Sequence, residues 1–354
     1  MGDMNADEYV EWIKGQCGWR ELLKVGNSAE CRAACNRTYE LMGYTEEEIH
    51  EAAIVPYEEH QRKLIRRCRD DLCKAICQHG PLRGGPPTIA FLPTRDYNAW
   101  ATRAPNGDEI CILDTSLMAT LHVVAECLAE ATIADESGKV GALSSAVHTI
   151  FEACLDFSGL GDEGTKTHLR RTRFQTASNR AWFASYLYEA LLVFVLAHEL
   201  AHNSLGHLDE TTEVDLRGIR AKIKVPVYTR SQRQELAADE LGFHSFLTYA
   251  RTLDRDLQPL LTPEVECTPL FFFELLTFVE NKLLRPADPS ISLPTHPSAV
   301  DRRQHLKELW ECNASLESRS YYPFVKPVFK MLNDGFDLII RQDSREVERG
   351  QQPT

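Results

Sequence analysis

The sequence predicts an α+β protein in which helices predominate and a small sheet follows the first 80 residues. Apolar residues recur at helical spacing over most of residues 7–78 and again from about 181 to 340. Between these regions, Thr88–Leu92 and Glu109–Leu113 are short apolar runs typical of strands. The tetrapeptide Pro-Asn-Gly-Asp at 105–108 has the composition of a turn between two extended segments.

Residues 1–80 are predicted to form a helical N-terminal region. Thr45 followed by three glutamates is typical of a helix start, and the run GPLRGGPP at 80–87 ends the helical pattern. The fragment NRTYELMGYTEEEI at 36–49 is similar to the helical part of a PAS sensor domain, although the strands of such a domain are not evident. A regulatory role for this region, through a regulatory partner, stays open.

The segments after the sheet are predicted to be mainly helical. Residues 117–133 have helical spacing, and a further helix is expected from about Ala181 to His202. Between them lies an insertion at about 133–180, whose glycine-rich part at 156–166 is expected to be a loop. The tail at 344–354 is expected to be disordered.

Two basic stretches, QRKLIRRCR at 61–69 and LRGIRAKIK at 216–224, are predicted to be helix faces exposed to solvent. The whole chain has 39 basic and 52 acidic residues, and its net charge of −13 argues against binding nucleic acid or an anionic membrane through a general positive field.

No secretory signal is expected at the N-terminus. No transmembrane segment is expected either, because the longest apolar run, LLVFVLA at 191–197, is far shorter than a membrane span. The eleven cysteines are odd in number and include no Cys-x-x-Cys pair. Their pattern favours reduced thiols and a cytoplasmic location.

The sequence HELAH places two histidines four residues apart at the end of that apolar run. On a helix, His198 and His202 lie on one face, so their imidazoles can bind one metal ion. Glu199 is one step further round the helix and can face a metal-bound water without being a ligand. This pattern predicts a metal site, provided that a third ligand exists.

Two spacings for the third ligand can be tested. One requires glycine and histidine at positions 205 and 208, which are both leucine, so that arrangement is excluded. The other requires an acidic residue on a later helix, and QELAADELGF at 234–243 supplies Glu235 as the ligand. Asp239, one turn further on, is the expected hydrogen-bond partner that orients a ligating histidine, most simply His198.

Four blocks in this order resemble the M48-type gluzincin metallopeptidases, relatives of the HtpX and Ste24 proteases. They are LAHELAHNSLGH at 196–207, QELAADELG at 234–242, THPSAVDR at 295–302 and YNAWAT at 97–102. The resemblance spans residues 88–310 and implies a gluzincin (zincin) metallopeptidase fold over residues 88–340, with a small sheet whose edge strand binds substrate. HtpX and Ste24 have membrane-spanning helices, which this chain does not show.

The resemblance also implies roles for particular residues. One zinc ion would be held by His198, His202 and Glu235, with Glu199 as the general base. His296 would approach the substrate and steady the oxyanion, and Arg302 would support the block that contains His296. Asn98 and Ala99 would lie on the edge strand beside an extended peptide substrate.

We therefore expect a zinc-dependent peptidase in which Glu199 activates a metal-bound water that attacks a peptide or protein substrate. Such an enzyme could be latent until residues 1–80 or the insertion move. The alternative is a sensing or binding module on a gluzincin scaffold with a non-catalytic metal site. Glu199 argues against that alternative, because a non-catalytic site needs no base.

Overall fold

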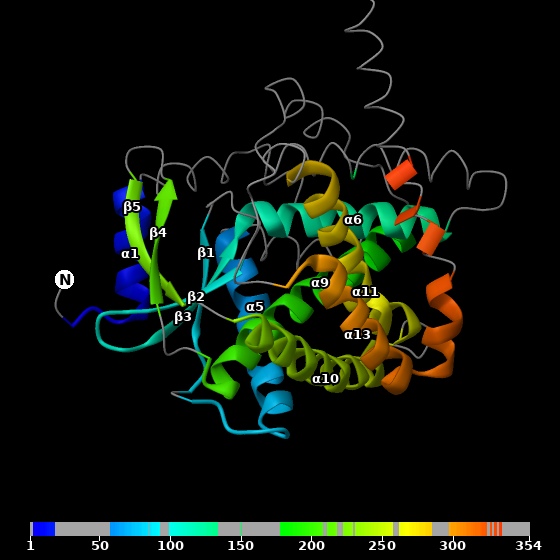
Figure 1. Cartoon of the computed structure of the whole chain (residues 1–354), viewed down its shortest axis with the longest axis horizontal. Helices are drawn as coiled ribbons and strands as arrows, with labels where there is room; N and C mark the ends of the chain where they lie inside the picture. The colour runs from blue at the N-terminus through cyan, green and yellow to red at the C-terminus, as the bar shows by residue number, and fades with distance from the viewer. Residues whose placement is uncertain are drawn as a thin grey trace, which may run out of the picture.

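The computed structural model describes most of the chain in segments (Figure 1). They are residues 3–17, 57–83, 85–92, 99–133, 150, 178–207, 211–217, 222–228, 231–257, 262–284 and 297–323, with six positions between 326 and 334. The PAS-like fragment at 36–49, nearly all of the insertion at 133–180 and the tail at 344–354 lie outside these residues.

The described elements make an α+β fold in which helices predominate over a small mixed sheet, as predicted. The helices are α1 (Ala6–Cys17), α5 (Tyr57–Ile76), α6 (Thr115–Ile133), α9 (Ser178–Leu205), α10 (Gln232–Leu257), α11 (Thr262–Phe278), the π-helix η1 (Val279–Leu284) and α13 (Ala299–Asn313). The strands are β1 (Thr88–Leu92), β2 (Ala99–Arg103), β3 (Glu109–Asp114), β4 (Thr211–Arg217) and β5 (Lys222–Tyr228).

The sheet has the order β1-β3-β2, with β1 parallel and β2 antiparallel to β3. Side chains alternate between its two faces, as the period of a strand requires. Trp100 and Ile112 pack with α1 and β5 on one face, whereas Ala99 and Leu113 belong to the larger helical core on the other. Because the strand order is β1-β3-β2, strand β2 is at an edge of the sheet among the described strands. It also contacts α9.

The antiparallel pair β4–β5 corrects one prediction, because the described residues of the stretch 216–224, which was expected to be helical, are the end of β4 and the start of β5. Polar and apolar residues alternate along β5, which is the period of a strand. Val225 and Val227 are buried against the sheet, and Lys224, which precedes Val225, is exposed. Contact with the sheet therefore outweighs the helical propensity of the neighbouring arginines and lysines.

Helix α9 is the centre of the larger core and contacts α5, α6, α10 and α11. The segment Phe183–Leu205 is long and apolar enough to cross a membrane by composition, yet 89% of its most apolar window is buried within the protein. A helix that is apolar all round needs neighbours on every side. In this structure those neighbours are other helices.

Both described helices of residues 1–80 belong to the same packed structure. Ile65, Cys68 and Leu72 of α5 are buried in the core around α9, and α1 covers the sheet with Val10 and Ile13. Deleting residues 1–80 would remove core side chains, so that deletion would test folding as well as latency. The described cysteines are all free thiols.

Helix α10 approaches α9 closely at Gly242. A Cβ added at Gly242 would lie 2.9 Å from Cα and 3.0 Å from the backbone nitrogen of His198. These are backbone atoms, which cannot move aside as a flexible side chain can. Gly242 therefore fixes the separation of the two helices that carry the predicted metal ligands.

We expect Gly242→Ala to destabilise the protein despite the higher helix propensity of alanine. Forcing a methyl group against backbone costs about 1–3 kcal/mol, whereas replacing glycine in a helix gains at most about 1 kcal/mol. Urea unfolding measures the difference, with exposed Glu240→Ala on the same helix as the control. A Gly242→Ala variant as stable as this control would show that the helices separate at no cost.

Candidate metal centre

Two helices supply three side chains whose donor atoms converge. His198 and His202 come from α9 and Glu235 from α10, and all three are buried. The two Nε2 atoms are 3.1 Å apart, and Glu235 carboxylate oxygens lie 3.4 Å from Nε2 of His198 and 3.5 Å from Nε2 of His202. This group could hold a metal ion.

The spacing and chemistry of the donor atoms fit a small tetrahedral cation. Bonds of about 2.0–2.1 Å in tetrahedral geometry separate ligand atoms by about 3.3–3.4 Å, close to the three distances observed. Imidazole nitrogens and a carboxylate oxygen are common zinc ligands. The donor set therefore suits zinc.

Helix α10 begins with a reciprocal cap that places Glu235 in its first turn. The Ser231 hydroxyl accepts a hydrogen bond from the Gln234 backbone N–H at 3.3 Å, and the Gln234 side chain accepts from the Ser231 N–H at 2.7 Å. This is a capping box, which satisfies backbone donors that the first turn leaves unpaired. The sequence signal for it, S-Q-R-Q at 231–234, was present but not used.

Asp239 occupies the orienting position expected from its spacing. The Nδ1–H of His198 donates to Asp239 Oδ1 at 2.9 Å, which leaves Nε2 directed at the converging group. Burial alone would raise the pKa of Asp239, but the Arg302 guanidinium and His198 outweigh burial and lower it. The carboxylate is therefore ionised where it holds the imidazole.

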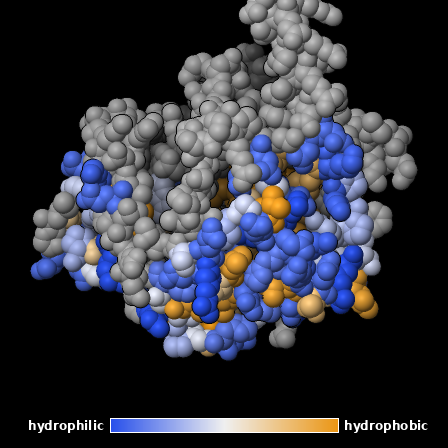
Figure 2. All heavy atoms as spheres, in the orientation of Figure 1, coloured by the Kyte–Doolittle hydropathy of each residue, from blue (hydrophilic) through white to orange (hydrophobic). Residues whose placement is uncertain are grey.

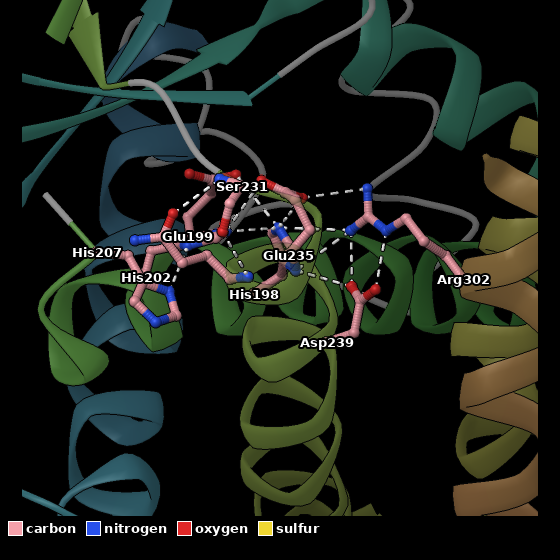
Figure 3. A network of polar contacts seen from close by, with 9 residues as sticks. His198, Glu199, His202, His207, Ser231, Glu235, Asp239 and Arg302 are labelled. Carbon is pink, nitrogen blue, oxygen red and sulfur yellow. Dashed lines mark hydrogen bonds and ion pairs between the residues drawn. The ribbon is translucent and has the colours of Figure 1, made fainter. Parts of the chain in front are cut away.

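Arg302 extends from α13 and holds Asp239 with two hydrogen bonds, at 2.8 Å from Nε and 2.6 Å from an Nη (Figure 3). Its other terminal nitrogen lies 3.4 Å from Glu235, and its guanidinium is 4.8 Å from the Phe273 ring centroid. The capping serine Ser298 begins α13 four residues earlier. Arg302 therefore joins the third helix to both carboxylates of α10.

The charges of the buried group are compatible with a divalent cation. Glu199, Glu235 and Asp239 are buried carboxylates, and Arg302 is the cation paired with two of them. With neutral imidazoles, three carboxylates and one guanidinium leave two negative charges, which are costly to bury uncompensated. Burial tends to lower the pKa of His198, but Asp239 and Glu235 raise it to about 9, so without a metal a proton offsets part of this charge.

Glu199 lies beside the converging group without belonging to it. Its carboxylate is 4.0 Å from Nε2 of His198, and its side chain is buried. One helical turn after Glu199, the side-chain amide of Asn203 donates a hydrogen bond to Glu109 on β3. Glu109 also accepts a hydrogen bond from Arg103 on β2 at 3.3 Å. This link, which the sequence did not reveal, ties the sheet to the metal-binding end of α9.

The other predicted residues are less fully placed. Ala99 is the first residue of β2, at the sheet edge, with its side chain in the helical core. Asn98 and His296 lie outside the described residues. Sequence reasoning missed Gly242, because its need for a small side chain is visible only from the contact with the backbone of His198.

We expect Asp239→Asn to weaken zinc binding by about 10–100-fold, the usual effect of removing a carboxylate that orients a ligating histidine. The amide retains the shape of the side chain but loses the charge that holds His198 and balances Arg302. Competition with a chromogenic zinc chelator measures the dissociation constant. Glu240→Gln, an exposed loss of one charge on the same helix, is the control, and equal affinities for the two variants would contradict the assignment.

Comparisons with protein-family models, with curated proteins and with solved structures found no match for this chain. The chemistry of the centre is accordingly inferred from its own side chains, of which His198, His202 and Glu235 form a buried group able to hold a metal ion.

Proposed function

We propose that the chain is a zinc-dependent peptidase with a gluzincin-type catalytic domain. The observation that carries the proposal is the buried convergence of His198, His202 and Glu235 beside a second glutamate, Glu199, that is not part of the converging group. A purely structural metal site has no use for that carboxylate. The family resemblance of the four sequence blocks supports the same conclusion.

His198, His202 and Glu235 would hold the zinc ion. When bound, zinc acts as a Lewis acid that polarises a carbonyl group and lowers the pKa of water to about 7. The side chains around it keep the ligands in place: Asp239 fixes the tautomer of His198, and Arg302 fixes Asp239. Burial of all three ligands excludes bulk water from this side of the centre.

Glu199 is the proposed general base and acid. It follows His198 on α9, so its carboxylate lies beside the ligand set on the same helix. It would accept a proton from the attacking water and later donate that proton to the amine that leaves. General acid–base catalysis of this kind contributes about 10²–10⁴-fold to rate.

Strand β2 is the proposed docking edge for an extended peptide. It lies at an edge of the described sheet and contacts α9, so a peptide paired with it would run beside the helix that carries the centre. Such pairing uses main-chain hydrogen bonds and tolerates varied side chains. Asn98 and Ala99 would begin this edge, and His296, two residues before Ser298, would steady the oxyanion.

The test is Glu199→Gln. We expect zinc to stay bound and cleavage of a peptide library to fall by about 10²–10⁴-fold, because the amide cannot take up a proton. Elemental analysis measures bound zinc, and mass spectrometry of the digest measures cleavage. The matched control is the exposed Glu240→Gln, which should cleave as the unchanged chain does.

Two results would count against the proposal. Cleavage retained by the zinc-bound Glu199→Gln protein would remove the role given to Glu199. Zinc bound by the unchanged chain with no cleavage of any library peptide would favour the sensing or binding module instead.

A further inference from the structure

The ring of His202 has a different partner on each of its two nitrogens. Nε2 faces His198 and Glu235, whereas Nδ1 lies 3.1 Å from Nδ1 of His207 (Figure 3). His202 is fully buried and His207 partly so, and their rings are inclined by 62°. The contact therefore lies on the side of His202 that points away from Glu235.

The end of α9 folds His207 back onto His202. Gly206 has a φ of +73°, and its N–H donates to the Asn203 carbonyl at 3.1 Å, while the His207 N–H donates to the His202 carbonyl at 2.9 Å. These two bonds form a Schellman motif, in which glycine supplies the left-handed residue. The backbone of His207 is thus fixed to the residue whose ring it contacts.

We propose, on the basis of the zinc site inferred above, that His207 is the positioning residue of His202. Its Nδ1 lone pair accepts the Nδ1–H of His202, so the Nε2 lone pair of His202 is free for the metal. His207 carries its own ring proton on Nε2. Nδ1 of His207 contacts Nδ1 of His202, which is the ring nitrogen that points away from Glu235. His207 therefore orients a metal ligand and is not a ligand itself.

The two ligating histidines are then oriented by different kinds of acceptor. His198 donates to a carboxylate whose charge Arg302 offsets, and His202 donates to a neutral imidazole. The buried group already has three carboxylates and one guanidinium. A fourth carboxylate at position 207 would add an uncompensated charge, whereas an imidazole orients His202 and leaves the charge unchanged.

The experiment compares His207→Asn with His207→Leu in the full chain. Both side chains branch at Cγ and have nearly the same shape, and the asparagine Oδ1 takes the place of the imidazole Nδ1, whereas leucine has no acceptor there. We expect the zinc dissociation constant to rise about 10–100-fold for leucine and to stay within about threefold of the unchanged chain for asparagine. Chelator competition gives the constants, and circular dichroism of the zinc-free proteins checks folding.

His207→Phe is the second variant, since it keeps an aromatic ring and lacks an acceptor, and it should bind zinc as weakly as leucine. Leucine or phenylalanine variants with unchanged affinity would overturn the proposal, as would an asparagine variant as weak as leucine. An unchanged chain that binds no zinc would overturn it together with the metal centre. Zinc binding with the expected order of variants but no peptide cleavage would support it and reject only the peptidase function.

Discussion

The metal centre depends on how closely α10 can approach α9. Three of the residues that define the centre, His198, Glu235 and Asp239, face each other across this contact, and their distances of 2.9–3.4 Å leave little room for a wider separation. The approach is set at Gly242, where even one methyl group would meet the backbone of His198. A constraint made by backbone against backbone is stiffer than one made by side chains, because no rotamer change relieves it.

Charge compensation is the second requirement of this buried site. Carboxylates can be buried at acceptable cost only when opposite charge and hydrogen bonds accompany them. Arg302 supplies one positive charge and two short hydrogen bonds to Asp239, and it also approaches Glu235. The described residues on the face seen in Figure 2 are mainly hydrophilic, whereas Glu199, Glu235 and Asp239 are buried, where such compensation is needed.

Much of the site could be predicted because its signals are local in sequence. His198 and His202 are one turn apart on a helix, and Glu235 and Asp239 are one turn apart on another, so each pair follows from helical geometry alone. The α+β class, the strands at 88–92 and 109–113 and the core helix that begins near residue 181 follow from apolar periodicity in the same way. That the two helices would meet was inferred from a resemblance, since spacing within one helix contains no information about the other.

What could not be predicted depends on contacts between distant segments. The basic stretch at 216–224 was expected to be an exposed helix face, and the burial of Val225 and Val227 against the sheet, which goes with strand β5, could not be seen in the sequence. The roles of Gly242 and His207 depend on contacts that the sequence does not reveal. Gly242 lies against the backbone of His198, and Nδ1 of His207 lies beside Nδ1 of His202. The Asn203–Glu109 link joins residues 94 positions apart and has no sequence signature.

The place of Arg302 in the chain has a consequence for how the centre is assembled. The helices that bear the metal ligands are complete by residue 257, yet the guanidinium that neutralises Asp239 is on α13, which α11 holds through the bond from Arg303 to Glu274. Both helices of the candidate metal centre therefore precede this counter-ion in the order of synthesis. Any chain that ends before position 302 lacks the guanidinium that pairs with Asp239, although it contains both helices of the candidate metal centre.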